Sequence, residues 1–115
     1  MKYILALLLF FSLQAKAADP ILMTKIMLCE SNLKHINVWG DGGDAYGIAQ
    51  FHKDTFYEFS KLAKKEMIKN KMWPADWFNR NHQIFLLSWG LDNGYENRWT
   101  CYRKIMREKK HLKYE

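Results

Sequence analysis

Two cysteines place the strongest constraint on how this chain of 115 residues folds. Cys29 stands in the first third of the chain and Cys101 close to its end. An even number of cysteines favours a disulfide over free thiols where the surrounding compartment is oxidising. Two unpaired structural cysteines are the alternative, whereas two thiols without a nearby pair of histidines make a poor zinc site. A bridge would tie the end of the first predicted helix to the last helix.

The first 17 residues have the features of a secretory signal peptide. Lys2 supplies positive charge, residues 4–13 are an apolar run, and Ala15-Lys16-Ala17 matches a small-residue cleavage site. The alternative is a membrane anchor, but that run is far shorter than the roughly 20 residues that span a bilayer. We therefore expect a mature domain of residues 18–115 with no stable membrane span, located in the periplasm or secreted.

The charge of the chain favours an anionic partner. The full sequence has a formal net charge of +6, and removal of Lys2 and Lys16 leaves +4. A bacterial cell wall, a nucleic acid or an anionic membrane surface would suit such a domain. Export and the moderate charge argue against a nucleic-acid partner. The basic run over residues 103–113 is typical of a solvated helix face.

The apolar pattern predicts an all-α fold. Helices are expected over residues 20–31, over residues 54–67, around Ile84, Leu87 and Leu91, and from about Glu96 onward. Asp19-Pro20 is typical of a helix start, and residues 32–44 predict a loop because they lack a helical period and contain three glycines. No segment alternates convincingly with the period of a strand. The prediction is a small domain of four to five short helices, packed irregularly around this loop.

Glu30 is the most informative single residue. It follows a largely apolar segment and lies in the last turn of the predicted helix, where the carbonyl ends disfavour a negative charge. Burial against apolar walls would raise its pKa further. A carboxyl that stays protonated near neutral pH can give its proton to a glycosidic oxygen. The alternative interpretation is a surface glutamate at a helix end.

A longer pattern surrounds Glu30. Glu30-Ser31 is followed by Gly40-Asp41-Gly42-Gly43 and then by residues 45–51, with the sequence Ala-Tyr-Gly-Ile-Ala-Gln-Phe. In order and spacing this resembles the soluble lytic transglycosylase branch of the lysozyme-like superfamily. The resemblance implies a lysozyme-like α domain in which a glycine-rich loop borders a substrate groove. It also implies cleavage of peptidoglycan at the β-1,4 bond between N-acetylmuramic acid and N-acetylglucosamine, with formation of a 1,6-anhydro product.

The same resemblance implies roles for individual residues. Glu30 would be the catalytic acid, and Ser31 would orient it. Gln50 would contact substrate in the cleft, and Asn93 keeps the place of a family residue on a later helix. Apart from the resemblance, Tyr46, Gly47 and Trp39 are candidates for substrate contact, because glycine lets the chain pass close to substrate and a flat ring packs well on a sugar. Trp39 is the tryptophan expected nearest to substrate, because it lies beside the glycine turn, whereas core packing is expected for most of the other four. No metal or cofactor is expected.

Two positions depart from the pattern of the family. Ala49 stands where the family commonly has methionine, and Asp92-Asn93 stands where it has a Tyr-Asn pair. Asp92 is therefore a candidate second carboxylate, which would make the enzyme a hydrolytic muramidase; the alternative is a residue that caps or ends a helix. Asp41 and Asp44 are further candidates, although aspartates beside glycines usually shape turns.

Three functions follow from these observations. The leading one is an exported lytic transglycosylase that acts on glycan strands, and the second is a hydrolytic muramidase. The third is a non-catalytic, cationic domain that binds the cell wall, which the missing tyrosine and the basic tail favour. A domain this small also suits a role in opening the wall for a secretion or conjugation complex, in phage lysis, or in wall remodelling.

Overall fold

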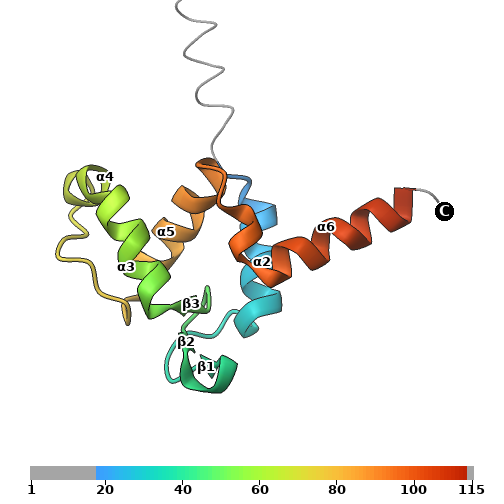
Figure 1. Ribbon diagram of the computed structural model, residues 1–115, viewed down its shortest axis with the longest axis horizontal. Coiled ribbons are helices and arrows are strands. Elements are labelled where there is room, and N and C mark those ends of the chain that lie inside the picture. Colours follow the sequence, from blue (N-terminus) through green and yellow to red (C-terminus); the bar gives the residue numbers. More distant parts are fainter. Residues whose placement is uncertain (1–17, 114–115) are drawn as a thin grey trace, which may run out of the picture.

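The computed structural model describes residues 18–113, which form a mostly helical domain (Figure 1). The expected signal peptide, residues 1–17, lies outside the described residues. The described part contains five α-helices, two short 3-10 helices and a small antiparallel sheet of three strands. The expectation of a mainly helical domain is confirmed, but the expectation of an all-α fold is wrong.

The first described helix, α2, spans Pro20–Ser31 as expected. Asp19 caps its start by accepting a hydrogen bond of 2.9 Å from the backbone N–H of Ile21. Proline at the first helical position has no N–H to leave unpaired. The helix ends where Asn32 adopts the left-handed conformation with φ 57°. Asparagine tolerates this conformation better than most residues, so the chain turns away directly after Glu30 and Ser31.

Three strands of two residues each make up the sheet. They are β1 (Trp39–Gly40), β2 (Ala45–Tyr46) and β3 (Phe51–His52), in that order. Trp39 pairs with Tyr46, which in turn pairs with Phe51. The 3-10 helix η1, Asp41–Gly43, connects β1 to β2. A strand of two residues is too short to show an alternating pattern, which is why the sequence does not reveal the sheet.

The helix expected over residues 54–67 is two helices. These are α3, Lys53–Leu62, and α4, Lys64–Lys69, with a break at Ala63, whose φ of −96° and ψ of 12° are not helical. Phe59, Ala63 and Met67 are all fully buried, on both sides of the break. The apolar period therefore continues across the break, because both helices face one core.

The last two α-helices differ in detail from the expectation. The helix α5, Arg80–Asp92, buries Gln83, Leu86, Leu87 and Gly90, whereas Ile84 and Leu91 are only partly buried. The final helix, α6 (Thr100–Lys113), does not begin near Glu96 as expected. A separate 3-10 helix, η2 (Glu96–Arg98), precedes it. Figure 1 shows α6 extending away from the other helices at its C-terminal end.

Aromatic side chains fill the core beneath the sheet. The ring of Phe51 lies 5.7 Å from that of Phe56, 5.9 Å from Phe59 and 5.3 Å from Trp99, each at a steep angle. Edge-to-face pairs of this kind add stability beyond the area that they bury.

Of the helices in the described range, none is long and apolar enough to cross a membrane.

Candidate functional site

A cleft of about 450 Å³ opens between the end of α2, the sheet and the junction of η2 with α6. Its lining comes from parts of the chain that are distant in sequence: Glu30, Gly40, Asp41, Gln50, Phe51, His52, Thr55, Arg98, Trp99, Thr100 and Cys101. Glu30, Gln50 and Gly40 thus share one cavity. The lining combines carboxylate, amide, imidazole, guanidinium and aromatic groups.

Glu30 is half-buried in the wall of this cleft. Burial raises the pKa of its carboxyl from 4.5 to about 7, and the negative charge of Asp41 acts in the same direction. A hydrogen bond from the backbone of Cys101 partly offsets these effects. A substantial fraction of the Glu30 carboxyl is therefore protonated at neutral pH. The cleft presents a group that can both donate and later accept a proton.

A second carboxylate in the cleft belongs to Asp41, at the start of η1. Its Oδ2 lies 2.8 Å from Nε2 of His52, and both side chains are exposed. The backbone turns sharply here, because Asp41 has φ 50° and Gly42 has φ 68°. Two carboxyl groups thus face one cavity, one of them half-buried and the other held by an imidazole.

The residues expected on the later helix lie elsewhere. Asp92 is the exposed last residue of α5 and does not line the cleft, and partial burial raises the pKa of its carboxyl. Asn93 follows it, and its side-chain amide donates a hydrogen bond of 2.7 Å to the carbonyl of Trp89. Asn93 thus caps the end of α5. The structure brings neither residue to the cavity that holds Glu30.

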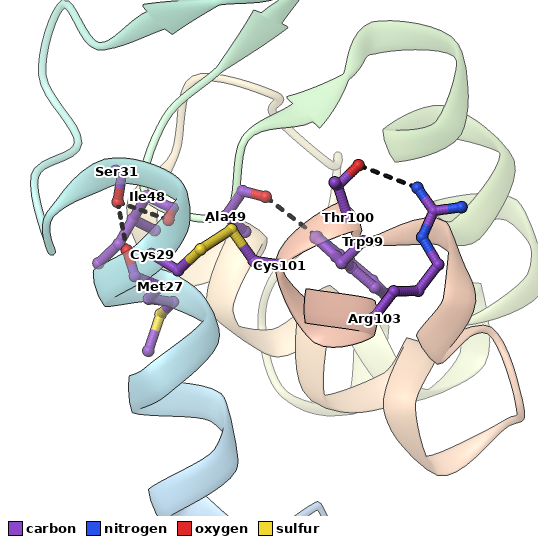
Figure 2. The surroundings of a disulfide bond; sticks show 9 residues. All are labelled: Met27, Cys29, Ser31, Ile48, Ala49, Trp99, Thr100, Cys101 and Arg103. Carbon is purple, nitrogen blue, oxygen red and sulfur yellow. Dashed lines mark hydrogen bonds between the residues drawn. A yellow bond between two sulfur atoms is a disulfide. The ribbon is translucent and has the colours of Figure 1, made fainter. Parts of the chain in front are cut away.

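Ser31 connects the end of α2 to the loop that follows β2. Its buried hydroxyl lies 2.9 Å from the carbonyl oxygen of Met27 and 2.7 Å from that of Ile48 (Figure 2). The single hydroxyl proton serves one of these oxygens at a time. Ser31 therefore positions Glu30 indirectly, by holding the chain segment opposite the helix end.

Tyr46 and Trp39 belong to one aromatic cluster. Tyr46 is buried, and its hydroxyl accepts a hydrogen bond of 3.1 Å from the backbone N–H of Asn37. The half-exposed ring of Trp39 lies 4.7 Å from Tyr46 and 6.1 Å from the exposed Phe78. Trp39 does not line the cleft, but its neighbour Gly40 does. The cluster therefore supports the sheet and leaves two aromatic rings at the surface.

Gln50 lies in the cleft with its amide already engaged. The backbone there has φ 50°, and Nε2 donates hydrogen bonds of 3.0 Å to the carbonyls of Val38 and Gly47. The side-chain oxygen of Gln50 occupies the space beside Gly40 that a larger residue would fill. Gln50 thus closes the loop between the outer strands and places a hydrogen-bond acceptor in the lining of the cleft.

Buried polar side chains hold the backbone of residues 46–51. Gln83, on α5, donates to the carbonyls of Tyr46 and Trp77 at 2.8 Å and accepts from the N–H of Ala49 at 3.1 Å. His35 accepts at Nδ1 from the N–H of Ile48 at 3.0 Å. Because buried amides rarely stay unpaired, these bonds fix an irregular segment in one conformation.

Two tryptophans complete this arrangement. The indole N–H of Trp77 donates to the carbonyl of Phe51 at 2.9 Å, and that of Trp99 donates to the carbonyl of Ala49 at 3.0 Å. Neither His35 nor Gln83 is identified from the sequence as a supporting residue. A polar residue among apolar neighbours is their only signal there, and that signal does not identify the partner.

Position 47 requires glycine for two reasons, the positive φ of its backbone and the side chains packed against it. Its φ is +88°, and a Cβ there would lie 2.6 Å from Oε1 of Gln83 and 2.7 Å from Cε1 of His35. Both side chains are buried and hydrogen-bonded, so neither can move aside cheaply. We expect Gly47→Ala to lower the free energy of unfolding by about 3 kcal/mol, combining left-handed strain with overpacking. Urea denaturation followed by circular dichroism measures this change.

Gly94 provides the matched control. Its φ is +85°, close to that of Gly47, but no atom lies within 4 Å of the position that a Cβ would take. Gly94→Ala should therefore cost only the strain of the left-handed backbone, about 1 kcal/mol. If Gly47→Ala and Gly94→Ala lower the free energy of unfolding equally, the contacts with Gln83 and His35 do not constrain position 47.

The disulfide joins this site to the last helix. Cys29 and Cys101 are bonded, with their Cα atoms 5.9 Å apart, so the expected bridge is confirmed (Figure 2). Cys29 precedes Glu30 directly, and Cys101 lines the cleft and hydrogen-bonds to Glu30 through its backbone. The bridge thus holds two walls of the cleft together.

Within the described part of the chain, no three His, Cys, Asp or Glu side chains gather closely enough to hold a metal ion. The groups that the cleft offers to a ligand are the side chains and backbone already named. Comparisons of the chain with protein-family models, with curated proteins and with solved structures found no match.

Proposed function

We propose that this protein is an exported enzyme that cleaves peptidoglycan glycan strands, most directly as a lytic transglycosylase. The observation that carries the proposal is the Glu30 carboxyl, half-buried in a cleft of about 450 Å³ with its pKa raised to about 7. Protonated carboxyls tuned in this way act as general acids in glycosidic bond cleavage. The resemblance of residues 30–51 to the transglycosylase family supports the same conclusion.

In this proposal Glu30 acts twice. It first gives its proton to the glycosidic oxygen, so that the glucosamine unit leaves with that oxygen as a hydroxyl. Its carboxylate then accepts the proton of the 6-hydroxyl of the muramic acid unit, whose oxygen bonds to the anomeric carbon and closes the 1,6-anhydro ring. The carboxyl is regenerated without water, so one acid suffices. A pKa near neutrality suits both steps, because neither charge state is strongly favoured.

A second candidate is hydrolysis of the same bond, and the position of Asp41 favours it. Its carboxylate shares the cleft with Glu30 and is held by His52 at 2.8 Å. Two carboxyl groups that flank a bond can act as acid and as base or nucleophile, with water as the acceptor. The sequence offers both Asp92 and Asp41 as candidates for the second carboxylate, and this hypothesis uses Asp41 because Asp92 does not line the cleft.

Mass analysis of the products tests the proposal. Purified cell walls incubated with the protein should release soluble glycan fragments, and mass spectrometry should find muropeptide ends that lack one water. Intact reducing ends would instead establish hydrolysis. If walls bind the protein and no fragment of either kind appears, both enzymatic proposals fail, and a non-catalytic wall-binding domain is the function that remains.

The proposed location is outside the cytoplasm, in the periplasm or the medium. A disulfide of this kind persists in oxidising compartments and is rare in the cytosol. The proposed partner is the glycan strand itself, and a secretion or conjugation complex is a setting in which such a small domain would open the wall locally.

A further inference from the structure

The net positive charge of the described domain comes from α6. Residues 18–99 contain ten Lys or Arg and ten Asp or Glu, so they are balanced, whereas α6 has six basic residues and one acidic residue. The acidic residue, Glu108, lies in a groove against α2 beside Lys25 and Leu28. Glu108 is itself exposed, but it lines this groove, so the side of α6 away from the groove carries only basic charged residues within residues 100–110.

Three cations on α6 form a continuous stripe, which we call the basic ridge: Arg103, Arg107 and Lys110. They are four and three residues apart, so they fall on one face of the helix, and all three are exposed. From Arg103 to Lys110 the helix axis rises by about 10 Å. The opposite face of the helix carries Cys101, which is buried, and Tyr102 and Ile105, which are partly buried and pack against the core. Packing therefore fixes the direction in which the basic ridge points.

The basic ridge begins at the edge of the cleft. Arg103 donates a hydrogen bond of 3.1 Å from its guanidinium to Oγ1 of Thr100, and Thr100 lines the cleft (Figure 2). Arg98 also lines the cleft and is held by Glu58 at 3.3 Å. The exposed cations Arg103, Arg107 and Lys110 thus run from the edge of the cleft along α6. The C-terminal end of this helix extends away from the other helices (Figure 1).

We propose that the basic ridge binds anionic groups on the same polymer that enters the cleft, namely the carboxylates of the stem peptides on a glycan strand. This inference rests on the proposed function, because it takes the occupant of the cleft to be peptidoglycan. Carboxylates along an extended strand match a row of guanidinium and ammonium groups in charge and in extent. The ridge would hold a long strand while the cavity takes the bond to be cut.

The test measures binding in a Glu30→Gln background, so that the ligand stays intact. The triple variant Arg103→Gln, Arg107→Gln and Lys110→Gln keeps good helix formers on α6. Its matched control removes three exposed lysines from α3 and α4, on the other side of the molecule (Figure 1): Lys61→Gln, Lys65→Gln and Lys69→Gln. Circular dichroism checks that all proteins are folded. The ligands are soluble peptidoglycan fragments with stem peptides and uncharged chitin oligosaccharides.

We expect the ridge variant to bind peptide-bearing fragments at least about tenfold more weakly than the control at low salt, with the difference disappearing near 1 M salt. Its affinity for chitin oligosaccharides should not change. Equal binding of fragments by ridge and control variants would overturn the inference. Binding to anionic lipid vesicles and to DNA is measured in the same way, and a loss of binding by the ridge variant that is confined to these ligands would also overturn the inference. Failure of the proposed function would look different: no fragments released by the wild type, with binding that still depends on the ridge.

Discussion

Replacing Glu30 with glutamine should reduce the release of soluble glycan from purified cell walls by at least about 100-fold. Glutamine keeps the shape of the side chain but cannot give or accept the proton, and general acid catalysis typically contributes roughly two to four orders of magnitude. In the wild type, the rate of release should fall as the pH rises through about 7, because the Glu30 carboxyl then loses its proton. Turbidity loss and quantified soluble muropeptides measure both effects.

The same substitution should change the pH dependence of stability. The pKa of Glu30 is about 7 in the folded protein and about 4.5 when unfolded, so the folded state holds a proton that the unfolded state has lost between these values. Stability conferred by this proton is full below pH 4.5 and is lost as the pH rises through 7. Glu30→Gln should therefore match the wild type in urea midpoint near pH 4 and exceed it at pH 8.

A neutralised surface carboxyl provides the control for both measurements. Glu66 lies exposed on α4 and does not line the cleft. Glu66→Gln should leave glycan release unchanged and should not produce the gain at pH 8. Undiminished release by Glu30→Gln would refute the assigned role of this carboxyl, whatever its effect on stability.

Removal of the disulfide should have the largest effect on stability. Cys29 and Cys101 are 72 residues apart, and for a loop of that length the chain-entropy model gives about 4 kcal/mol. We expect the double variant Cys29→Ser and Cys101→Ser to lose free energy of unfolding of this order, measured by urea denaturation. A domain of this size has little stability to spare, since single domains typically have about 5 to 15 kcal/mol in total.

Reductant separates the effect of the bridge from that of the serines. Dithiothreitol should lower the urea midpoint of the wild type to near that of the double variant, and should leave the double variant unchanged. Glycan release by the double variant should fall as its folded fraction falls. Release should also be lower than that of the wild type at temperatures where the double variant remains folded, because Cys101 lines the cleft beside Glu30. A wild type that is equally stable with and without reductant would contradict the expected contribution of the bridge.

The helical parts of the fold are the ones that the sequence predicts best. The first helix is predicted to its boundaries, because Asp19-Pro20 is a local start signal and the chain leaves the helix directly after Ser31. The break at Ala63 and the start of α6 at Thr100 are not predicted. Apolar periodicity reports which side of the chain is buried, and the break at Ala63 keeps the same side buried.

Some residues of the candidate site are likewise identified from the sequence, and others only from the structure. Glu30, Gln50 and the glycine turn are identified together, since they lie in one short stretch of sequence with a recognisable order. Asp92 and Asn93 follow from their place in a family pattern, whereas the structure puts Asp41 and His52 in the cleft with Glu30. The pairing of β1 with β2 and of β2 with β3 decides which residues face the cleft, and two-residue strands leave no trace in the sequence.

The sequence by itself determined the chemical components of this protein: the acid at a helix end, the glycine turn, the pair of cysteines and the cationic last helix. Each of these depends on residue type and local spacing, which a chain displays before it folds. Only the tertiary structure decided how they combine. Burial sets the pKa of Glu30, Asp41 shares its cleft, and Gln83 and His35 hold residues 46–51 in place. These effects arise from contacts between distant segments and from exclusion of water, and the local sequence determines neither of them.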